Sequence, residues 1–172
     1  MDFAKAFDRV GRSIVINKLI ALRLPGAVVK WFASFLANRQ QRVKIGCAFS
    51  NWLQLNGSMP QGSWLGPLSF IILIDDLKLS CLTHKFVDDT TVTEILSRRQ
   101  QSSMQQYYNE LVDWTDSNLM RINDSKTKEM IIGSDAAIVA IPPLLSSGSD
   151  QIERVDRFKL LGITISRDLK WS

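Results

Sequence analysis

Two adjacent carboxylates, Asp88 and Asp89, lie between two β-prone runs, residues 85–87 and 90–92. Such a pattern is typical of a β-hairpin with the acidic pair at its tip. A double aspartate on a tight turn is either a solvated turn or part of a site for a hard cation such as Mg²⁺. A second double aspartate, Asp75 and Asp76, ends an apolar run and is interpreted as the polar end of a helix. Taken alone, the pattern favours a solvated turn, so a metal site at Asp88 requires acidic residues from elsewhere in the chain.

Asp2 is the candidate for that second carboxylate, at the end of an expected strand. Two-metal phosphoryl transfer uses carboxylates from separate segments that converge on cations about 3.5–4 Å apart. Neighbouring strands lie about 4.8 Å apart, so adjacent placement would let Asp2 and Asp88 share an ion. One metal would activate the attacking hydroxyl, and the other would neutralise charge on the leaving phosphate.

The elements that must position these residues follow from hydrophobic periodicity. Helical spacing of apolar residues predicts helices over residues 11–24, 28–38 and 102–119. A run that is apolar on all sides, residues 67–74, predicts a buried helix.

Alternating patterns predict the strands. They cover residues 39–45 and 52–55 as one hairpin, residues 130–132 as a short strand, and residues 158–165 as a strand pair with Gly162 at the bend. Together with the helices, these strands predict an α+β fold, an antiparallel sheet with helices packed mainly on one face.

Two stretches keep two interpretations. On the first hairpin, Arg39, Arg42 and Lys44 form either a solvated face or a face that contacts phosphate groups. The glycine- and proline-rich loop of residues 57–66 is either a plain connection into a core helix or a backbone cradle whose N–H groups meet phosphate.

Composition narrows the class of protein. The chain has 172 residues, 45% hydrophobic and 22% charged, which is enough for a domain with a real core. Its net charge of +4 allows a polyanionic partner. The single histidine, His84, argues against histidine-based zinc sites and most histidine acid–base schemes. Two cysteines in no metal spacing predict a reduced intracellular setting, and no apolar run is long enough to cross a bilayer.

Five motifs, in order along the chain, resemble the palm of reverse transcriptases, and within them the non-LTR retrotransposon class. They are residues 2–8 (DFAKAFD), 60–68 (PQGSWLGPL), 86–89 (FVDD), 118–127 (NLMRINDSKT) and 158–162 (FKLLG). The second motif is the most specific, and the ordered set is far stronger than any single member. The resemblance covers nearly the whole chain, so residues 1–172 are interpreted as a palm subdomain fragment, cut at both ends, that lacks most of the fingers and thumb.

The resemblance implies catalytic and metal-binding roles. Asp2 and Asp88 would be the principal metal ligands, with Asp89 as a third carboxylate of weaker direct role. The carbonyl of Phe3 would also face a metal. Lys126 would neutralise or protonate the leaving pyrophosphate.

The resemblance also implies how substrates are held. Phe7, five residues after Asp2, matches the steric gate that excludes a ribose 2′-hydroxyl. Gln61 and Gly62 would help hold the incoming nucleotide. The primer grip would be formed by Phe158, Leu161 and Gly162.

The implied activity of the parent protein is RNA-directed DNA polymerisation with two Mg²⁺ ions, for which Mn²⁺ is an alternative. The implied partners are an RNA template, a DNA primer and deoxynucleoside triphosphates, with no membrane, in the nucleus. The isolated fragment is expected to be inactive. One alternative is a catalytically inactive retroelement remnant with at most weak nucleic-acid binding. Another is an RNA-dependent RNA polymerase, against which Phe7 and residues 60–62 speak.

Overall fold

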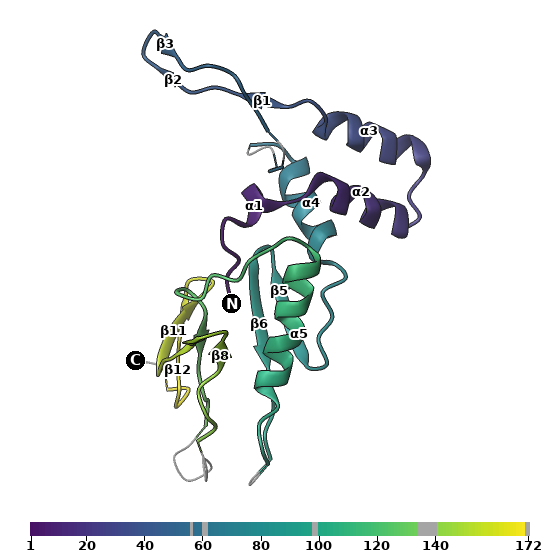
Figure 1. The fold of residues 1–172 in the computed structure, drawn as a ribbon. Helices are drawn as coiled ribbons and strands as arrows, with labels where there is room; N and C mark the ends of the chain where they lie inside the picture. The colour runs from purple at the N-terminus through teal and green to yellow at the C-terminus, as the bar shows by residue number, and fades with distance from the viewer. Residues whose placement is uncertain (56, 60–61, 98–99, 134–140, 171–172) are drawn as a thin grey trace. The chain divides into compact units, whose positions relative to one another are not determined.

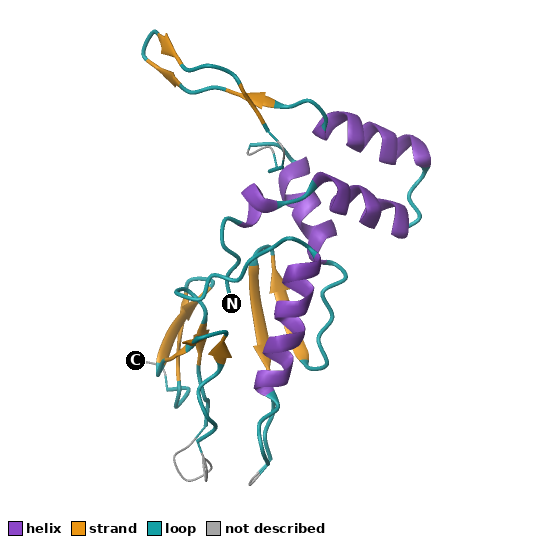
Figure 2. Cartoon of the chain, viewed as in Figure 1, coloured by secondary structure: helices purple, strands orange, loops and turns teal. Residues whose placement is uncertain are grey.

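The computed structural model describes every residue except 56, 60–61, 98–99, 134–140 and 171–172. The described chain combines five helices with short strands in pairs (Figures 1 and 2). It divides into two compact units, one formed by Met1–Ala4, Lys78–Thr115 and Arg121–Ser172, the other by Lys5–Leu77 and Asp116–Met120. The predicted α+β class is confirmed, with the strands paired two by two.

In the unit that contains Lys5–Leu77, helices form most of the core. They are α1 (Ala6–Arg9), α2 (Arg12–Ala21), α3 (Gly26–Leu36) and α4 (Leu65–Ile74). Helix α2 packs against both α3 and α4. The side chains that carry this packing are buried: Val15, Leu19, Phe32, Leu36, Phe70 and Leu73. Each of the first two predicted helices is confirmed, and Pro25 separates them because proline suits a helix start and cannot continue the preceding helix.

Helix α4 corrects one expectation. Its apolar surface runs all round, which predicts complete burial, but Leu68 is 45% exposed and Ile71 is 49% exposed. The opposite face, with Phe70 and Leu73, carries the contacts with the rest of the unit. The described unit therefore covers only one side of the helix.

The C-terminal end of α4 confirms the interpretation of the second double aspartate. Asp75 is the C-cap residue, and Asp76 Oδ1 lies 2.5 Å from Lys18 Nζ. Lys18 also donates a hydrogen bond to the Leu73 carbonyl, one of the carbonyls left without an intrahelical partner. Asp75 and Asp76 thus belong to a helix terminus held by a lysine.

The same unit contains the predicted first hairpin, built from four short strands. They are β1 (Gln40–Gln41), β2 (Lys44–Ile45), β3 (Ala48–Phe49) and β4 (Leu53–Gln54). Strand β1 pairs with β4, and β2 with β3, both antiparallel.

In the other unit, β5 (Leu82–Phe86) and β6 (Asp89–Thr93) form the predicted antiparallel hairpin. Helix α5 (Met104–Ser117) buries Tyr108 and Leu111. Glu110 on this helix accepts a hydrogen bond from the Ser80 backbone N–H at 2.8 Å, which anchors the segment that leads into β5.

Three further strand pairs complete this unit. They are β7 (Lys128–Glu129) with β10 (Glu153–Arg154), β8 (Ser146–Ser147) with β9 (Asp150–Gln151), and β11 (Arg157–Leu160) with β12 (Ile163–Ser166). The first pair is parallel and the others are antiparallel. The predicted strand pair around Gly162 is confirmed.

The prediction of a strand over residues 130–132 is wrong, because the strand is Lys128–Glu129 and ends one residue before the predicted start. The Glu129 carboxylate lies 2.8 Å from Arg154, and its carbonyl accepts the Val155 N–H at 2.8 Å. These contacts commit Glu129 to β10, and the apolar residues that follow have no strand partner in the described chain.

No helix in the described part of the chain has the length and apolar character that a membrane span requires.

Candidate active site

The residues nearest the N-terminus are held between two distant parts of the chain. The Met1 amine donates to the Thr90 carbonyl at 2.8 Å, and the Thr90 N–H donates to the Met1 carbonyl at 3.1 Å. On the other side, the Asn123 N–H donates to the Asp2 carbonyl at 2.8 Å, and Phe3 forms an antiparallel bridge with Ile122. The segment Met1–Ala4 therefore acts as a strand between β6 and residues 121–123.

This register determines which carboxylates meet. Met1 and Thr90 exchange both backbone hydrogen bonds, so they are directly opposed in an antiparallel pair. One step along, Asp2 lies level with Asp89, and directly opposed residues project from the same face. The resemblance gives Asp89 the weaker role, yet the register brings it level with Asp2, with Asp88 next to it in the turn.

The turn that carries Asp88 has an unusual backbone. The pair Phe86 and Asp89 closes it, so Val87 and Asp88 are its two central residues. Val87 has φ 54°, and a positive φ at the first central residue alone is the pattern of a type II′ turn. Glycine is the usual residue there, and a β-branched residue is strained by about 1–3 kcal/mol. Strain of this size next to a candidate ligand persists only where the flanking strands impose it.

The Asp2 carboxylate has two partners from the fourth motif. Lys126 Nζ lies 3.1 Å from Asp2 Oδ2, and Asn123 Nδ2 donates a hydrogen bond to the same oxygen at 3.4 Å. The Asp2 side chain is 19% exposed, whereas that of Lys126 is 70% exposed. Lys126 thus neutralises Asp2 itself in this structure, a contact that the sequence interpretation did not anticipate.

Asn123 is the residue that sequence reasoning missed. It lay inside a motif but received no role. Besides its side-chain hydrogen bond, its backbone N–H holds the Asp2 carbonyl. The only signal in the sequence was its position three residues before Lys126. In the structure these residues form a turn in which the Lys126 N–H donates to the Asn123 carbonyl at 3.1 Å.

The Met1 amine reports on the charge around it. Burial lowers the pKa of this amine below its ordinary value of 8.0, while the negative charges of Asp89 and then Asp2 act in the opposite direction. Both carboxylates therefore lie within electrostatic range of one amine, as expected for neighbours across two strands.

The donor chemistry fits a hard divalent cation. Within the described residues, no group of three or more His, Cys, Asp and Glu side chains is arranged to hold a metal ion. Mg²⁺ in nucleotide-transferring sites is bound by one or two carboxylates, with substrate phosphates and water completing the shell. Asp2, Asp88 and Asp89 can supply carboxylate oxygens of that kind, and Lys126 occupies one of them in this structure.

Phe3 serves packing through its side chain. Its ring is buried, 4% exposed, and lies 6.1 Å from the Trp114 ring of α5. This contact ties the Asp2 strand to the helix. The metal-facing role expected for the Phe3 carbonyl stays a prediction.

The expected nucleotide-binding residues belong to the unit of Lys5–Leu77. Phe7 is half-buried, with its ring 5.1 Å from that of Phe70, and its carbonyl accepts the Met59 N–H at 2.9 Å. Gly62 is exposed and has φ +76°, which glycine adopts with less strain than other residues. Gln61 lies outside the described residues.

The expected primer grip is the β11–β12 hairpin. Leu161 and Gly162 are its two central residues, with φ 48° and 87°, so glycine at the second position meets a backbone requirement. Leu161 is 54% exposed at the turn, and Phe158 lies within β11. The hairpin is confirmed, and its contact with a primer stays a prediction.

Comparisons with known proteins give the family to which the chain belongs. The family model described as "Reverse transcriptase (RNA-dependent DNA polymerase)" matches residues 1–165. The chain is similar to the RNA-directed DNA polymerase from mobile element jockey of Drosophila melanogaster, at 26% identity over 186 aligned residues that cover 100% of the chain and 20% of that protein. It is also similar to a probable RNA-directed DNA polymerase from transposon BS of the same organism, at 24% identity over 181 aligned residues, 98% of the chain and 20% of that protein.

The chain thus spans about a fifth of the length of the curated relatives that it matches. The matched region includes all five motifs and the strand segments that bring Asp2 to β6 and Asn123. This chain belongs to the reverse transcriptase family.

Proposed function

We propose that residues 1–172 are the palm part of an RNA-directed DNA polymerase of the non-LTR retrotransposon class, with its reaction centre at Asp2, Asp88 and Asp89. The observation that carries the proposal is the hydrogen-bonded strand Met1–Ala4, which lies against β6 in a register that sets Asp2 level with Asp89. Two-metal phosphoryl transfer uses carboxylates from separate segments of the chain, and this register brings Asp2 to the segment of Asp88 and Asp89.

The reaction joins a deoxynucleotide to a primer. The primer 3′-hydroxyl loses its proton to water, and its oxygen forms a bond to the α-phosphorus. The bond between that phosphorus and the bridging oxygen breaks, and pyrophosphate leaves. When bound, two Mg²⁺ ions activate the 3′-hydroxyl and neutralise charge on the phosphates. Mn²⁺ has similar ligand preferences and is expected to substitute.

The chain's own residues hold the geometry. Asn123 orients the Asp2 carboxylate through its amide and fixes the Asp2 strand through its backbone N–H. Lys126 holds a positive charge at Asp2 Oδ2, and releasing this carboxylate leaves its ammonium available to a leaving phosphate. The flanking strands β5 and β6 hold Val87 in the tight turn that presents Asp88.

The substrate roles follow the family. Phe7 excludes the ribose 2′-hydroxyl, Gln61 and Gly62 hold the incoming nucleotide, and the β11–β12 hairpin supports the primer. The partners are an RNA template, a DNA primer and deoxynucleoside triphosphates, encountered in the nucleus. Because the relatives are about five times longer, the chain by itself is proposed to be inactive in polymerisation.

The test separates the metal site from the activity. Mn²⁺ binding to the 172-residue chain is measured by electron paramagnetic resonance for the wild type, Asp2→Asn and Asp88→Asn. Both variants are expected to bind at least tenfold more weakly, because each removes a charged ligand. The matched control is Asp75→Asn, which alters the other double aspartate, at the end of α4, and is expected to bind like the wild type.

Binding that survives both Asp2→Asn and Asp88→Asn would overturn the site. Primer extension by the same chain on an RNA template with Mg²⁺ is expected to stay at background. Extension that Asp88→Asn abolishes would overturn the proposed inactivity of the chain alone. Absence of Mn²⁺ binding in the wild type would favour an inactive remnant of a retroelement.

A further inference from the structure

The hairpin of β1 to β4 has a register shift that gathers particular side chains on one face. At the open end of the hairpin, Gln40 pairs with Gln54 and Gln41 pairs with Leu53. Next to the turn, Lys44 pairs with Phe49 and Ile45 pairs with Ala48. The Ser50 N–H donates to the Val43 carbonyl at 3.0 Å, which extends the pairing of Lys44 with Phe49 by one residue. Arg42 is consequently opposed by two residues, Asn51 and Trp52, which defines a β-bulge.

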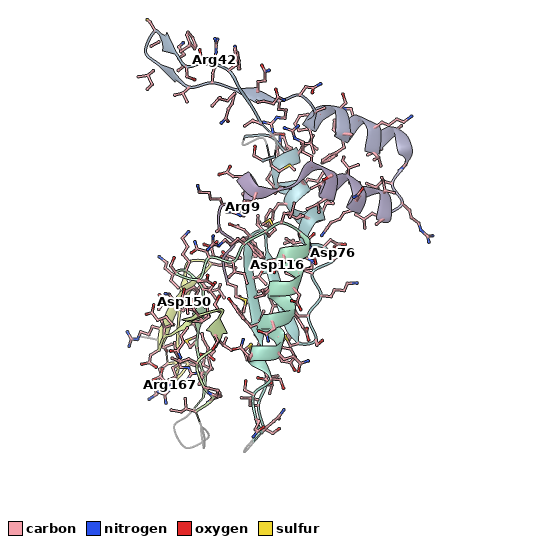
Figure 3. The ribbon with its side chains drawn as sticks, viewed as in Figure 1. Arg9, Arg42, Asp76, Asp116, Asp150 and Arg167 are labelled. Atoms are coloured by element: carbon pink, nitrogen blue, oxygen red, sulfur yellow. The ribbon has the colours of Figure 1, made fainter. Side chains whose placement is uncertain are left out.

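The bulge has a direct effect on side-chain direction. Phe49 and Trp52 are three residues apart, so in a regular strand they would project from opposite faces. The extra residue brings them to the same face, where both meet Arg42. The Arg42 guanidinium carbon lies 4.0 Å from the centre of the Phe49 ring and 4.5 Å from that of Trp52. Figure 3 labels Arg42 on this hairpin.

Lys44 completes the cluster. It is paired directly with Phe49, and its Nζ lies 5.4 Å from the centre of the Phe49 ring. We call the surface of Gln40, Arg42, Lys44, Phe49, Trp52 and Gln54 the basic–aromatic face. The other face of the hairpin carries aliphatic residues, among them Val43 and Leu53.

This face is open to solvent and its charge has one sign. Every residue from 40 to 54 is exposed, and Phe49 and Trp52 are 49% and 56% exposed. Between Asp8 and Asp75 the sequence has eight lysines and arginines and no aspartate or glutamate. Arg42 and Lys44 therefore have no acidic partner within their own stretch of chain, and their contacts on this face are with aromatic rings.

We propose that the basic–aromatic face binds single-stranded nucleic acid. Exposed aromatic rings offer stacking platforms for unpaired bases, and the arginine and lysine beside them meet the phosphates. The bases of a duplex are stacked on one another and present no free ring faces, so Phe49 and Trp52 cannot stack on them. Because neither stacking nor phosphate contact reads the 2′-hydroxyl, RNA and DNA single strands are expected to bind alike. The inference is independent of the proposed polymerisation, since it involves none of the carboxylates.

The test uses the 172-residue chain and a fluorescein-labelled 20-nucleotide oligouridine, with EDTA present so that no metal contributes. Fluorescence anisotropy is expected to show about tenfold weaker binding for Trp52→Ala, with most of the affinity retained by Trp52→Phe. The variant Arg42→Gln with Lys44→Gln is expected to bind more weakly and to reduce the slope of log affinity against log salt by about 1.4, roughly 0.7 per lost phosphate contact. The matched control, Arg23→Gln with Lys30→Gln, removes the same charge from exposed positions elsewhere in the same unit and is expected to retain the slope.

A second readout locates the bound strand. Cys47 is exposed in the turn of the hairpin, and the other cysteine, Cys81, is removed by Cys81→Ser before labelling. An environment-sensitive fluorophore on Cys47 is expected to change its emission when oligouridine binds, with the midpoint that anisotropy gives.

Three results would overturn the proposal. The first is wild-type affinity in Trp52→Ala together with Arg42→Gln and Lys44→Gln. The second is tighter binding of a duplex of the same length than of the single strand. The third is a response of the Cys47 label to anionic lipid vesicles and none to oligouridine. Equal thermal stability of each variant and the wild type is the control for folding, and the exposure of all these positions makes it the expected result.

Discussion

The ion pair between Lys126 and Asp2 leads to a sharp prediction about metal affinity. Lys126 Nζ lies 3.1 Å from the Asp2 oxygen that would serve as a ligand, so a cation and the lysine compete for the same carboxylate. Lys126→Met removes the ammonium and keeps an unbranched chain of similar length. We expect this variant to bind Mn²⁺ more tightly than the wild type.

The size of the effect depends on where the lysine goes. If it stayed on Asp2 about 5 Å from a divalent ion, repulsion would be about 1.7 kcal/mol even with the dielectric constant of water. If the lysine side chain instead moves away from Asp2, only the ion pair is lost, which contributes about 0.2–1 kcal/mol when one partner is exposed. Since the Lys126 side chain is 70% exposed, moving away is the cheaper route. Removing the charge should therefore tighten binding by about 1.4- to 5-fold.

The assay is a Mn²⁺ titration followed by electron paramagnetic resonance. Lys126→Arg keeps the charge and should bind like the wild type. Lys128→Met removes an equal charge two residues away, from a lysine that lies 2.6 Å from Glu153, and should also leave affinity unchanged. Weaker Mn²⁺ binding by Lys126→Met, or tightening of the same size by Lys128→Met, would refute direct competition at Asp2.

Three further predictions concern stability. At the strained turn, Val87→Gly should have a free energy of unfolding in urea about 0.5–1 kcal/mol higher than Val87→Ala, because φ 54° strains any residue that has a Cβ. A higher free energy of unfolding for the alanine variant would contradict this. The hydrogen bond from the Ser80 N–H is the main cause that lowers the pKa of Glu110 from 4.5, so the carboxylate stabilises the fold above pH 4.5 and this stabilisation is lost as the pH falls through the lowered pKa. Glu110→Gln should therefore lower Tm at pH 7 and approach the wild-type Tm in acid, and a Tm difference that is the same at both pH values would refute this. The buried Tyr108 hydroxyl lies 2.8 Å from Ser147 Oγ, so Tyr108→Phe should cost about 1 kcal/mol, or about 2–4 °C in Tm by calorimetry, and an unchanged Tm would show that this contact contributes nothing.

Local patterns were sufficient for most elements and failed where pairing or burial depended on partners. Residues 130–132 are apolar and β-prone, yet the strand is Lys128–Glu129, because the Glu129 carboxylate and carbonyl are committed to Arg154 and Val155. Helix α4 is apolar on all sides, yet Ile71 is exposed, because periodicity describes a helix and not what lies beside it. Both errors concern contacts with residues far apart in the chain, present at Glu129 and lacking at Ile71 within the described unit.

The sequence by itself determined the α+β class, the hairpin that carries Asp88 and Asp89, and the family, since turn chemistry, periodicity and ordered motifs are local or linear properties. Only the tertiary structure decided that Asp2 is level with Asp89, that Lys126 and Asn123 hold the Asp2 carboxylate, and that a bulge sets Phe49 and Trp52 on one face with Arg42. Each of these depends on the register between segments, and a shift of one residue would reverse the face of every side chain involved.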